Sequence, residues 1–182
     1  MNSARSLAAV LADADKPLPP PWHGPIDASR EEFYTAVGSL INTEPQLALA
    51  VCRQAFAQAE TRGENDAAVY ALLRMFAVLQ NTAMDSALKA HVWALVAERA
   101  DKVVDPILAV RLELVDLVRL VDRGENALVL ARGHGALAKA LAIGRGPLVL
   151  GALCPVALAL RRLGEPDLAL DLYEQVHPLL PK

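Results

Sequence analysis

The residue types that most often carry chemistry are few in this sequence and poorly spaced for catalysis. None of its five serines, at positions 3, 6, 29, 39 and 86, lies in a Gly-x-Ser-x-Gly nucleophile elbow or beside a convincing histidine partner. The glycine-rich stretch GRGP at 144–147 lacks the Lys-Ser/Thr pair of a phosphate-binding loop, so we interpret it as a helix–helix turn. We therefore predict no catalytic residues and a protein that is not an enzyme.

Histidines and cysteines are likewise spaced too widely for a metal site. The four histidines, at positions 23, 91, 134 and 177, form no i, i+4 pair and no HExxH motif. Cys52 and Cys154 lie in apolar segments without a CxxC pair or a Cys/His cluster, which is typical of small core residues in a reducing compartment. We predict no metal, no cofactor and a cytoplasmic location.

The composition favours helices. Apolar residues make up 54% of the 182 residues and aromatic residues only 4%, so alanine, leucine and valine must build the core of a single domain. A net charge of -3 leaves no basic stripe for a nucleic acid. The longest uncharged run, 146–160, contains Pro155 and is shorter than the roughly 18 residues that suggest a membrane helix. We expect neither a nucleic-acid nor a membrane partner.

Residues 1–29 differ from the rest of the chain. A short helix is expected over 3–14, and five prolines follow between Pro17 and Pro25, where they remove backbone donors and favour extended geometry. We predict an N-terminal arm with a proline-rich linker at 1–29 and a helical repeat domain at 30–182. A disordered tail is the alternative, and Trp22 distinguishes the two because a large indole beside a proline run is usually docked on apolar surface.

Regular punctuation divides the rest of the chain into helices. Breaker clusters recur about every twenty residues, and apolar residues between them recur three and four residues apart, as in Val69, Leu72, Leu73 and Phe76. Glycines at 63, 124, 144 and 164 stand where a left-handed residue ends a helix, and prolines at 45, 106, 147 and 166 stand in first turns. We predict helices at 30–41, 45–62, 65–81, 83–101, 105–122, 126–143, 147–163 and 165–178, packed as antiparallel pairs because their connections are short.

The last helical stretch, LGEPDLALDLYEQVHPLLP at 163–181, carries a recognisable pattern. Gly164, Ala169, Tyr173, Leu179 and Pro181 occupy the places of a turn glycine, a small contact residue, an aromatic residue, a leucine and a terminating proline. This stretch resembles the second helix of a tetratricopeptide repeat. The resemblance implies a right-handed αα-superhelix of about four antiparallel helix pairs.

Earlier helices fit the same pattern in weaker form. Small contact positions separated by 39, 42 and 40 residues are occupied by Ala48, Ala87, Val129 and Ala169. Such side chains allow two helices to approach, and each hairpin covers apolar surface left by its neighbour. Degenerate repeats of this length are similar to the helical arms of bacterial signalling regulators. A helical bundle without superhelical curvature is the alternative architecture.

Two breaks in helix chemistry have more than one interpretation. The sequence GHG at 133–135 places two glycines inside a predicted helix, and Pro155 interrupts the next one. One interpretation is a close helix crossing with a kink, and the other is a weakened element that moves when a ligand binds. The second agrees with an alternative function, that of a small-molecule-binding protein or unrecognised enzyme with an apolar cavity near residues 133–155.

The leading functional hypothesis is a non-enzymatic module that binds a protein or peptide, as a sensory or scaffold part of a bacterial regulatory system. In the family that the chain resembles, the first helix of each pair lines the concave surface. Polar and aromatic residues on these helices are the candidate partner contacts: Tyr34, Tyr70, Arg74, Asn81, Arg111 and Arg119. The alternative for each is a solvated side chain, or one that pairs with a local carboxylate such as Glu113. A third hypothesis is a homodimer formed through a terminal helix.

Overall fold

The computed structural model describes residues 3–20, 22, 24–82 and 85–180, and this part of the chain is all-α without strands. Pro181 of the repeat pattern, His23 and part of the predicted 83–101 helix lie outside the described residues. The predicted helical class is confirmed. The α-helices are α1 (Ser3–Leu11), α2 (Glu31–Leu40), α3 (Pro45–Arg62), α4 (Asn65–Asn81), α5 (Ser86–Arg99), α6 (Pro106–Asp122), α7 (Asn126–Ile143), α8 (Gly146–Arg162) and α9 (Pro166–Val176), with short 3-10 helices η1 (Ala100–Lys102) and η2 (His177–Leu179).

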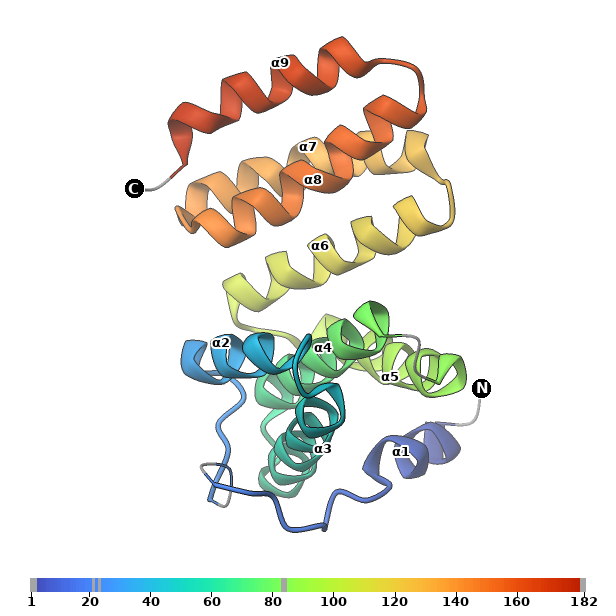
Figure 1. The fold of residues 1–182 in the computed structure, drawn as a ribbon, viewed down its shortest axis with the longest axis vertical. Coiled ribbons are helices and arrows are strands. Elements are labelled where there is room, and N and C mark those ends of the chain that lie inside the picture. Colours follow the sequence, from blue (N-terminus) through green and yellow to red (C-terminus); the bar gives the residue numbers. More distant parts are fainter. Residues whose placement is uncertain (1–2, 21, 23, 83–84, 181–182) are drawn as a thin grey trace. The chain divides into compact units, whose positions relative to one another are not determined.

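The helices form two compact units (Figure 1). Unit 1, Met1–Asp105, contains α1 to α5 and η1, whereas unit 2, Pro106–Lys182, contains α6 to α9 and η2. The boundary between the units falls directly before α6. The predicted boundary at residues 29 and 30 stays a prediction.

Helix ends follow the predicted glycine chemistry. Gly63 ends α3 with φ 68°, and its backbone N–H lies 3.1 Å from the carbonyl oxygen of Glu60. A side chain at this φ would strain the backbone, so the residue acts as a left-handed cap. The prediction of left-handed glycines is confirmed by the φ angles of 68°, 76°, 72° and 86° at Gly63, Gly124, Gly144 and Gly164.

Helix α4 forms the centre of unit 1. It packs most extensively against α3, and also against α5 and α2. Its buried side chains point in nearly every direction around the helix, which is the pattern of a helix enclosed by neighbours. Leu72, Leu73 and Met75 are among the largest fully buried side chains of the described chain.

Helix α1 is docked within unit 1 against α5 and α3 (Figure 1). Val10 is fully buried, and Ser6, 1% exposed, has its Oγ 3.2 Å from Nδ1 of His91 on α5. Residues 24–26 are also held on α3, because Gln58 Oε1 accepts the backbone N–H of Ile26 at 2.7 Å. Both parts of the N-terminal segment therefore contact the helices of unit 1.

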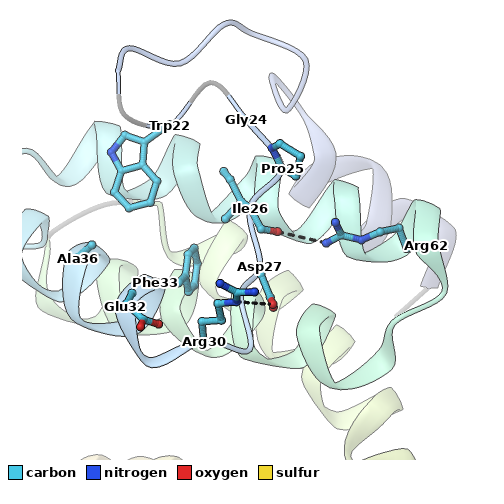
Figure 2. Close-up of a pocket in the computed structure, with 10 residues that line it drawn as sticks. All are labelled: Trp22, Gly24, Pro25, Ile26, Asp27, Arg30, Glu32, Phe33, Ala36 and Arg62. Carbon is cyan, nitrogen blue, oxygen red and sulfur yellow. Dashed lines mark hydrogen bonds and ion pairs between the residues drawn. The ribbon is translucent and has the colours of Figure 1, made fainter.

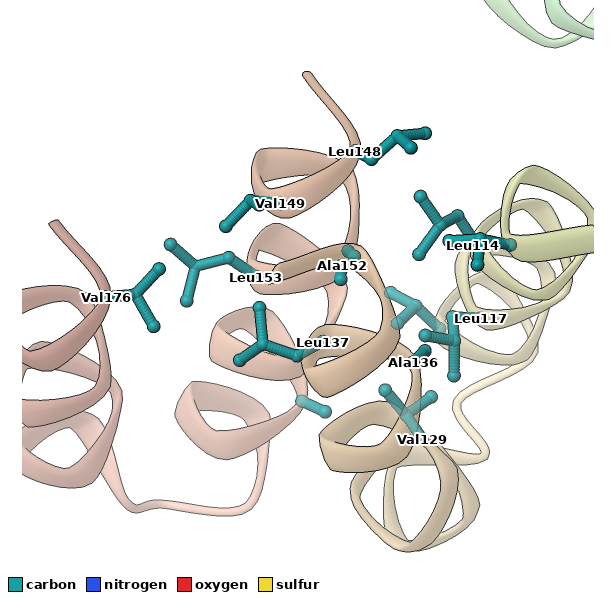
Figure 3. Packing of buried hydrophobic residues seen from close by; sticks show 14 of the residues in the cluster. Leu114, Leu117, Val129, Ala136, Leu137, Leu148, Val149, Ala152, Leu153 and Val176 are labelled. Atoms are coloured by element: carbon teal, nitrogen blue, oxygen red, sulfur yellow. The ribbon is translucent and has the colours of Figure 1, made fainter. Parts of the chain in front are cut away.

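Unit 2 is built around a core of leucine, valine and alanine side chains from all four of its helices (Figure 3). Helix α8 packs against α7, α9 and α6. The helices α7 and α8 pack tightly at Gly133, where a Cβ would lie 2.3 Å from Cγ2 of Val156. This contact gives Gly133 of the GHG sequence a structural reason, since only glycine leaves room for Val156, whereas a Cβ at Gly135 would have nothing within 4 Å. This contact supports the interpretation of the GHG sequence as part of a close helix crossing.

Helix α8 continues through Pro155. The proline is buried, and the residue four positions before it is Gly151. A proline removes the hydrogen bond to that residue and crowds its carbonyl group.

None of the helices in the described ranges is long and apolar enough to cross a membrane.

Candidate binding surfaces

Three of the six predicted contact residues meet in unit 1. The rings of Tyr34 on α2 and Tyr70 on α4 are in edge contact, with centroids 5.8 Å apart and an interplanar angle of 82°. The guanidinium carbon of Arg74, one turn after Tyr70, lies 3.4 Å from the centroid of the Tyr34 ring. Arg74 also donates to the backbone carbonyl of Tyr34. The cluster thus joins α2 to α4 through an aromatic pair and a cation–π contact.

Gly38 makes room for this cluster. A Cβ at Gly38 would lie 3.4 Å from Nη2 of Arg74, at the limit of ordinary contact. Full burial raises the pKa of the Cys52 thiol to about 12, although the positive charge of Arg74 acts to lower this pKa. Arg74 is therefore positioned by the packing of α2 on α4.

Tyr70 and Asp66 hold the last residues of unit 1 onto α4. The Tyr70 hydroxyl donates to Oδ2 of Asp105 at 2.7 Å. The Asp66 carboxylate accepts the backbone N–H groups of Val104 at 3.3 Å and Asp105 at 2.8 Å. Tyr70 is only 4% exposed, so most of its side chain serves these internal contacts. Its assignment as a partner contact stays a prediction.

The other predicted contact residues are not part of this cluster. Asn81, the last residue of α4, donates from Nδ2 to a backbone carbonyl one turn earlier at 2.8 Å. Arg111 and Arg119 lie on α6 in unit 2, where Arg119 pairs with Asp116 at 3.3 Å. Pairing with a local carboxylate is the alternative to a partner contact that the sequence analysis gives for each of these residues. The contact of Arg119 with Asp116 on the same helix is of this kind. These three assignments also stay predictions.

A pocket of about 460 Å³ opens between Trp22 with residues 24–27, the start of α2 and the end of α3 (Figure 2). Trp22, Ile26 and Phe33 give it an apolar lining, and Trp22 is half-buried. The volume lies in the range of small-molecule sites. Arg62 donates to the Ile26 carbonyl at 3.2 Å, which fixes one wall on α3.

Both arginines that line this pocket pair with a neighbouring carboxylate. Arg30 lies 3.1 Å from Asp27, and Arg62 lies 3.0 Å from Glu64. The pKa of Asp27 is lowered, first by the hydrogen bond from the Ser29 side chain, which favours the ionised carboxylate. The pocket therefore offers apolar surface beside two paired arginines, and Glu32 adds a carboxylate to its lining.

The exposed apolar side chains gather on unit 2. Of nine large hydrophobic side chains exposed in the described chain, eight belong to unit 2 and five of these lie within residues 163–179. Single exposed apolar residues are common, but a group of them on one part of the surface marks a contact site. Unit 2 therefore carries the stronger candidate for an interaction surface.

Four residues define the part of this surface that we call the α8–α9 face: Leu150 and Cys154 of α8, and Leu170 and Tyr173 of α9. The first two are four residues apart and the last two are three apart, so each pair lies along one side of its helix. The pKa of Tyr173 is raised, first by burial and then by the neighbouring thiol of Cys154, so these two side chains lie close together across the helices. Leu150 is 44%, Leu170 58% and Tyr173 40% exposed, so the face is open over both helices.

An acidic ridge borders this face on α9. Asp167, Asp171 and Glu174 follow at intervals of four and three residues and are exposed, and α9 contains no lysine or arginine. Within the described part of the chain, no ion pair involves these three carboxylates. A depression lined by Tyr173, Glu174 and His177 continues the face toward the end of α9. The surface combines apolar area with uncompensated negative charge.

The two cysteines differ in their surroundings. Cys52 is buried, as predicted, whereas Cys154 is exposed on α8. The prediction that both are core residues is wrong for Cys154, because it occupies the outer side of a helix whose other side forms the core. Both thiols are free.

The contact between Ser6 and His91 is the one Ser–His pair that the described residues bring together. This contact was not foreseen from the sequence, and the expectation that no serine has a catalytic histidine partner stays a prediction. Nothing in the local sequence predicts the contact, because 85 residues separate the two side chains. A catalytic serine must reach its substrate, but Ser6 is 1% exposed, so this pair serves to dock α1.

No protein-family model, curated protein or solved structure matches the chain. The candidate surfaces are therefore defined by the geometry and chemistry of the chain's own residues.

Proposed function

We propose that the chain is a non-enzymatic helical module that binds a protein or peptide, and that it docks its partner on the α8–α9 face. The observation that carries this proposal is the exposure of Leu150, Leu170 and Tyr173 on two helices that pack against each other. Apolar side chains at such a position lose contact with water when a partner binds, which favours association. The buried position of Ser6 supports the non-enzymatic assignment.

We also propose that residues 30–182 form a scaffold like that of tetratricopeptide repeats, with right-handed superhelical stacking within each unit. Support comes from the repeat pattern and from antiparallel neighbours at the predicted spacing: α2 packs on α3, α4 on α5, α6 on α7 and α8 on α9. The small contact residues Ala48, Val129 and Ala169 are buried, while Ala87 is exposed and departs from the pattern. By its resemblance to the arms of bacterial signalling regulators, the module would be a cytoplasmic sensory or scaffold part.

Site-specific photo-cross-linking in cells tests the proposed function. A photoreactive phenylalanine analogue replaces Leu170 in the full chain, and a matched control carries it at Ala138, which is exposed on α7. We expect a discrete cross-linked protein from position 170 and none from position 138. Equal labelling from both positions, or none from position 170, would contradict a docking role for the α8–α9 face.

A second candidate function is the binding of a small molecule by unit 2. A pocket of about 390 Å³ lies between α6 and α7, with apolar walls that include Val110, Ala142 and Ile143. Glu113 and Lys139, paired at 2.6 Å, stand at the same pocket and could orient a polar group. Its α7 wall lies within the 133–155 region for which the sequence predicts a cavity. A thermal-shift screen with the unchanged chain and an Ala142→Phe variant tests this candidate, because a ligand of this pocket would stabilise only the unchanged chain.

A further inference from the structure

We propose that the partner segment of the α8–α9 face is an amphipathic helix with a basic flank. This inference rests on the proposed function and names the chemical class of the partner. Three observations support it: the exposed apolar side chains of the face, the negative charge beside them, and the poor fit of a second copy of the chain to that charge.

The apolar side chains are arranged for a third helix. Leu150 and Cys154 project from α8, and Leu170 and Tyr173 project from the adjoining side of α9. Exposed apolar side chains along the shared edge of two packed helices offer a surface for the apolar stripe of another helix. The stripe of such a partner repeats every three and four residues, which matches the spacing on both walls.

The charges beside the α8–α9 face determine which charge is favoured on the polar flank of that helix. Asp167, Asp171 and Glu174 run along the α9 wall, and Arg161, two turns after Cys154, is the cation on the α8 wall. Three negative charges against one positive charge leave the rim acidic. Lysine or arginine side chains on the partner flank that faces α9 complement this rim and steer association.

A second copy of the chain fits this face poorly. An antiparallel pairing of two α9 helices would bring two acidic ridges together, and like charges at an interface oppose binding. Each helix of the described chain contains at most two lysine or arginine residues, so none offers a strongly basic flank. Anionic lipids and nucleic acids are repelled by the same carboxylates. The face therefore selects a basic helix from another protein.

Fluorescence anisotropy with synthetic helices and the full chain tests this inference. The first probe is an amphipathic helix of leucine and lysine, about 18 residues long because shorter isolated helices are marginal in water. The second has glutamate in place of every lysine, and the third has neutral glutamine there. We expect the basic probe to bind about tenfold more tightly than the neutral one, with the acidic probe weakest and the difference shrinking as salt is added.

Charge reversal at the ridge supplies the matched control. Asp171→Lys with Glu174→Lys changes two exposed side chains and leaves Asp167, which favours the start of α9, in place. The double variant should reverse the preference between the basic and acidic probes, while circular dichroism confirms that it stays helical. If all three probes bind the unchanged chain equally, the inference is overturned but the proposed function stands. A basic-helix partner is excluded if no probe binds, or if light scattering finds a dimer that Leu170→Ser dissociates. These two results leave the proposed function to be decided by the cross-linking experiment.

Discussion

Replacement of Gly133 by alanine should destabilise the protein although alanine is the better helix former. In the interior of α7 the exchange would gain about 1 kcal/mol from helix propensity alone. The new Cβ, however, would lie 2.3 Å from Cγ2 of the buried Val156. Valine is stiff at χ1 and has little room to turn away, and overpacking of this kind costs about 1–3 kcal/mol. Since a contact this short belongs to the upper part of that range, we expect a net loss of about 1–2 kcal/mol.

Gly135 is the matched control in the same helix. Nothing lies within 4 Å of a Cβ at this exposed position, so Gly135→Ala should stabilise the protein by about 1 kcal/mol. Urea unfolding followed by circular dichroism measures both changes. In a Val156→Ala background, the cost of Gly133→Ala should fall by about 2–3 kcal/mol, the overpacking contribution, because the clashing methyl group is gone. If Gly133→Ala is as stable as Gly135→Ala, the close crossing of α7 and α8 is refuted.

Three further predictions concern thiols, a helix cap and pH. Under native conditions a thiol reagent should modify Cys154 rapidly and Cys52 only after unfolding, because Cys52 is fully buried and its pKa is raised to about 12; equal rates would argue against the packing of α3. Asp85→Ala should lower the free energy of unfolding by about 0.5–2 kcal/mol in denaturant titrations, because its carboxylate caps two N–H groups at the start of α5; an unchanged value would disprove the cap. The lowered pKa of Asp27, caused first by the hydrogen bond from Ser29, implies a stabilising contribution that is complete above the unfolded value of 3.8 and is lost as the pH falls through the lower folded value. The stability difference between the unchanged chain and Asp27→Asn should therefore shrink in acid, and a difference independent of pH would contradict the Asp27–Ser29 contact.

Local chemistry made the helices predictable. Pro45 and Gly63 delimit α3 in the sequence, and the helix runs Pro45–Arg62 as predicted. A proline in a first turn and a glycine after a last turn act through backbone geometry that needs no tertiary context. Ends without such signals were less well defined, as for the predicted 83–101 helix, which is α5 (Ser86–Arg99) followed by a 3-10 turn.

Long-range contacts were not predictable from the sequence. The Tyr70–Asp105 hydrogen bond joins residues 35 positions apart, and Ser6 and His91 are farther apart still. Periodicity identifies the apolar sides of a helix but does not tell which of them meets a neighbour. Helix α8 is apolar almost all round, so Cys154 could be placed on its open side only from the packing.

The candidate site was predictable only in part. Tyr34, Tyr70 and Arg74 were chosen for their chemistry, and the packing of α2 on α4 brings them together as internal contacts. Leu170 and Tyr173 have the spacing of core residues in the sequence. Their exposure depends on how α9 is rotated against α8, which the sequence pattern alone does not determine.

Hydrogen-exchange mass spectrometry of the full chain, with and without the basic amphipathic probe, tests the central claim most directly. If the α8–α9 face is the docking surface, the probe should slow exchange across α8 and α9 and leave α2 to α4 unchanged, because binding protects the backbone amides of the helices that it covers. Protection confined to unit 1, or none on α8 and α9 when the probe is bound, would contradict the account.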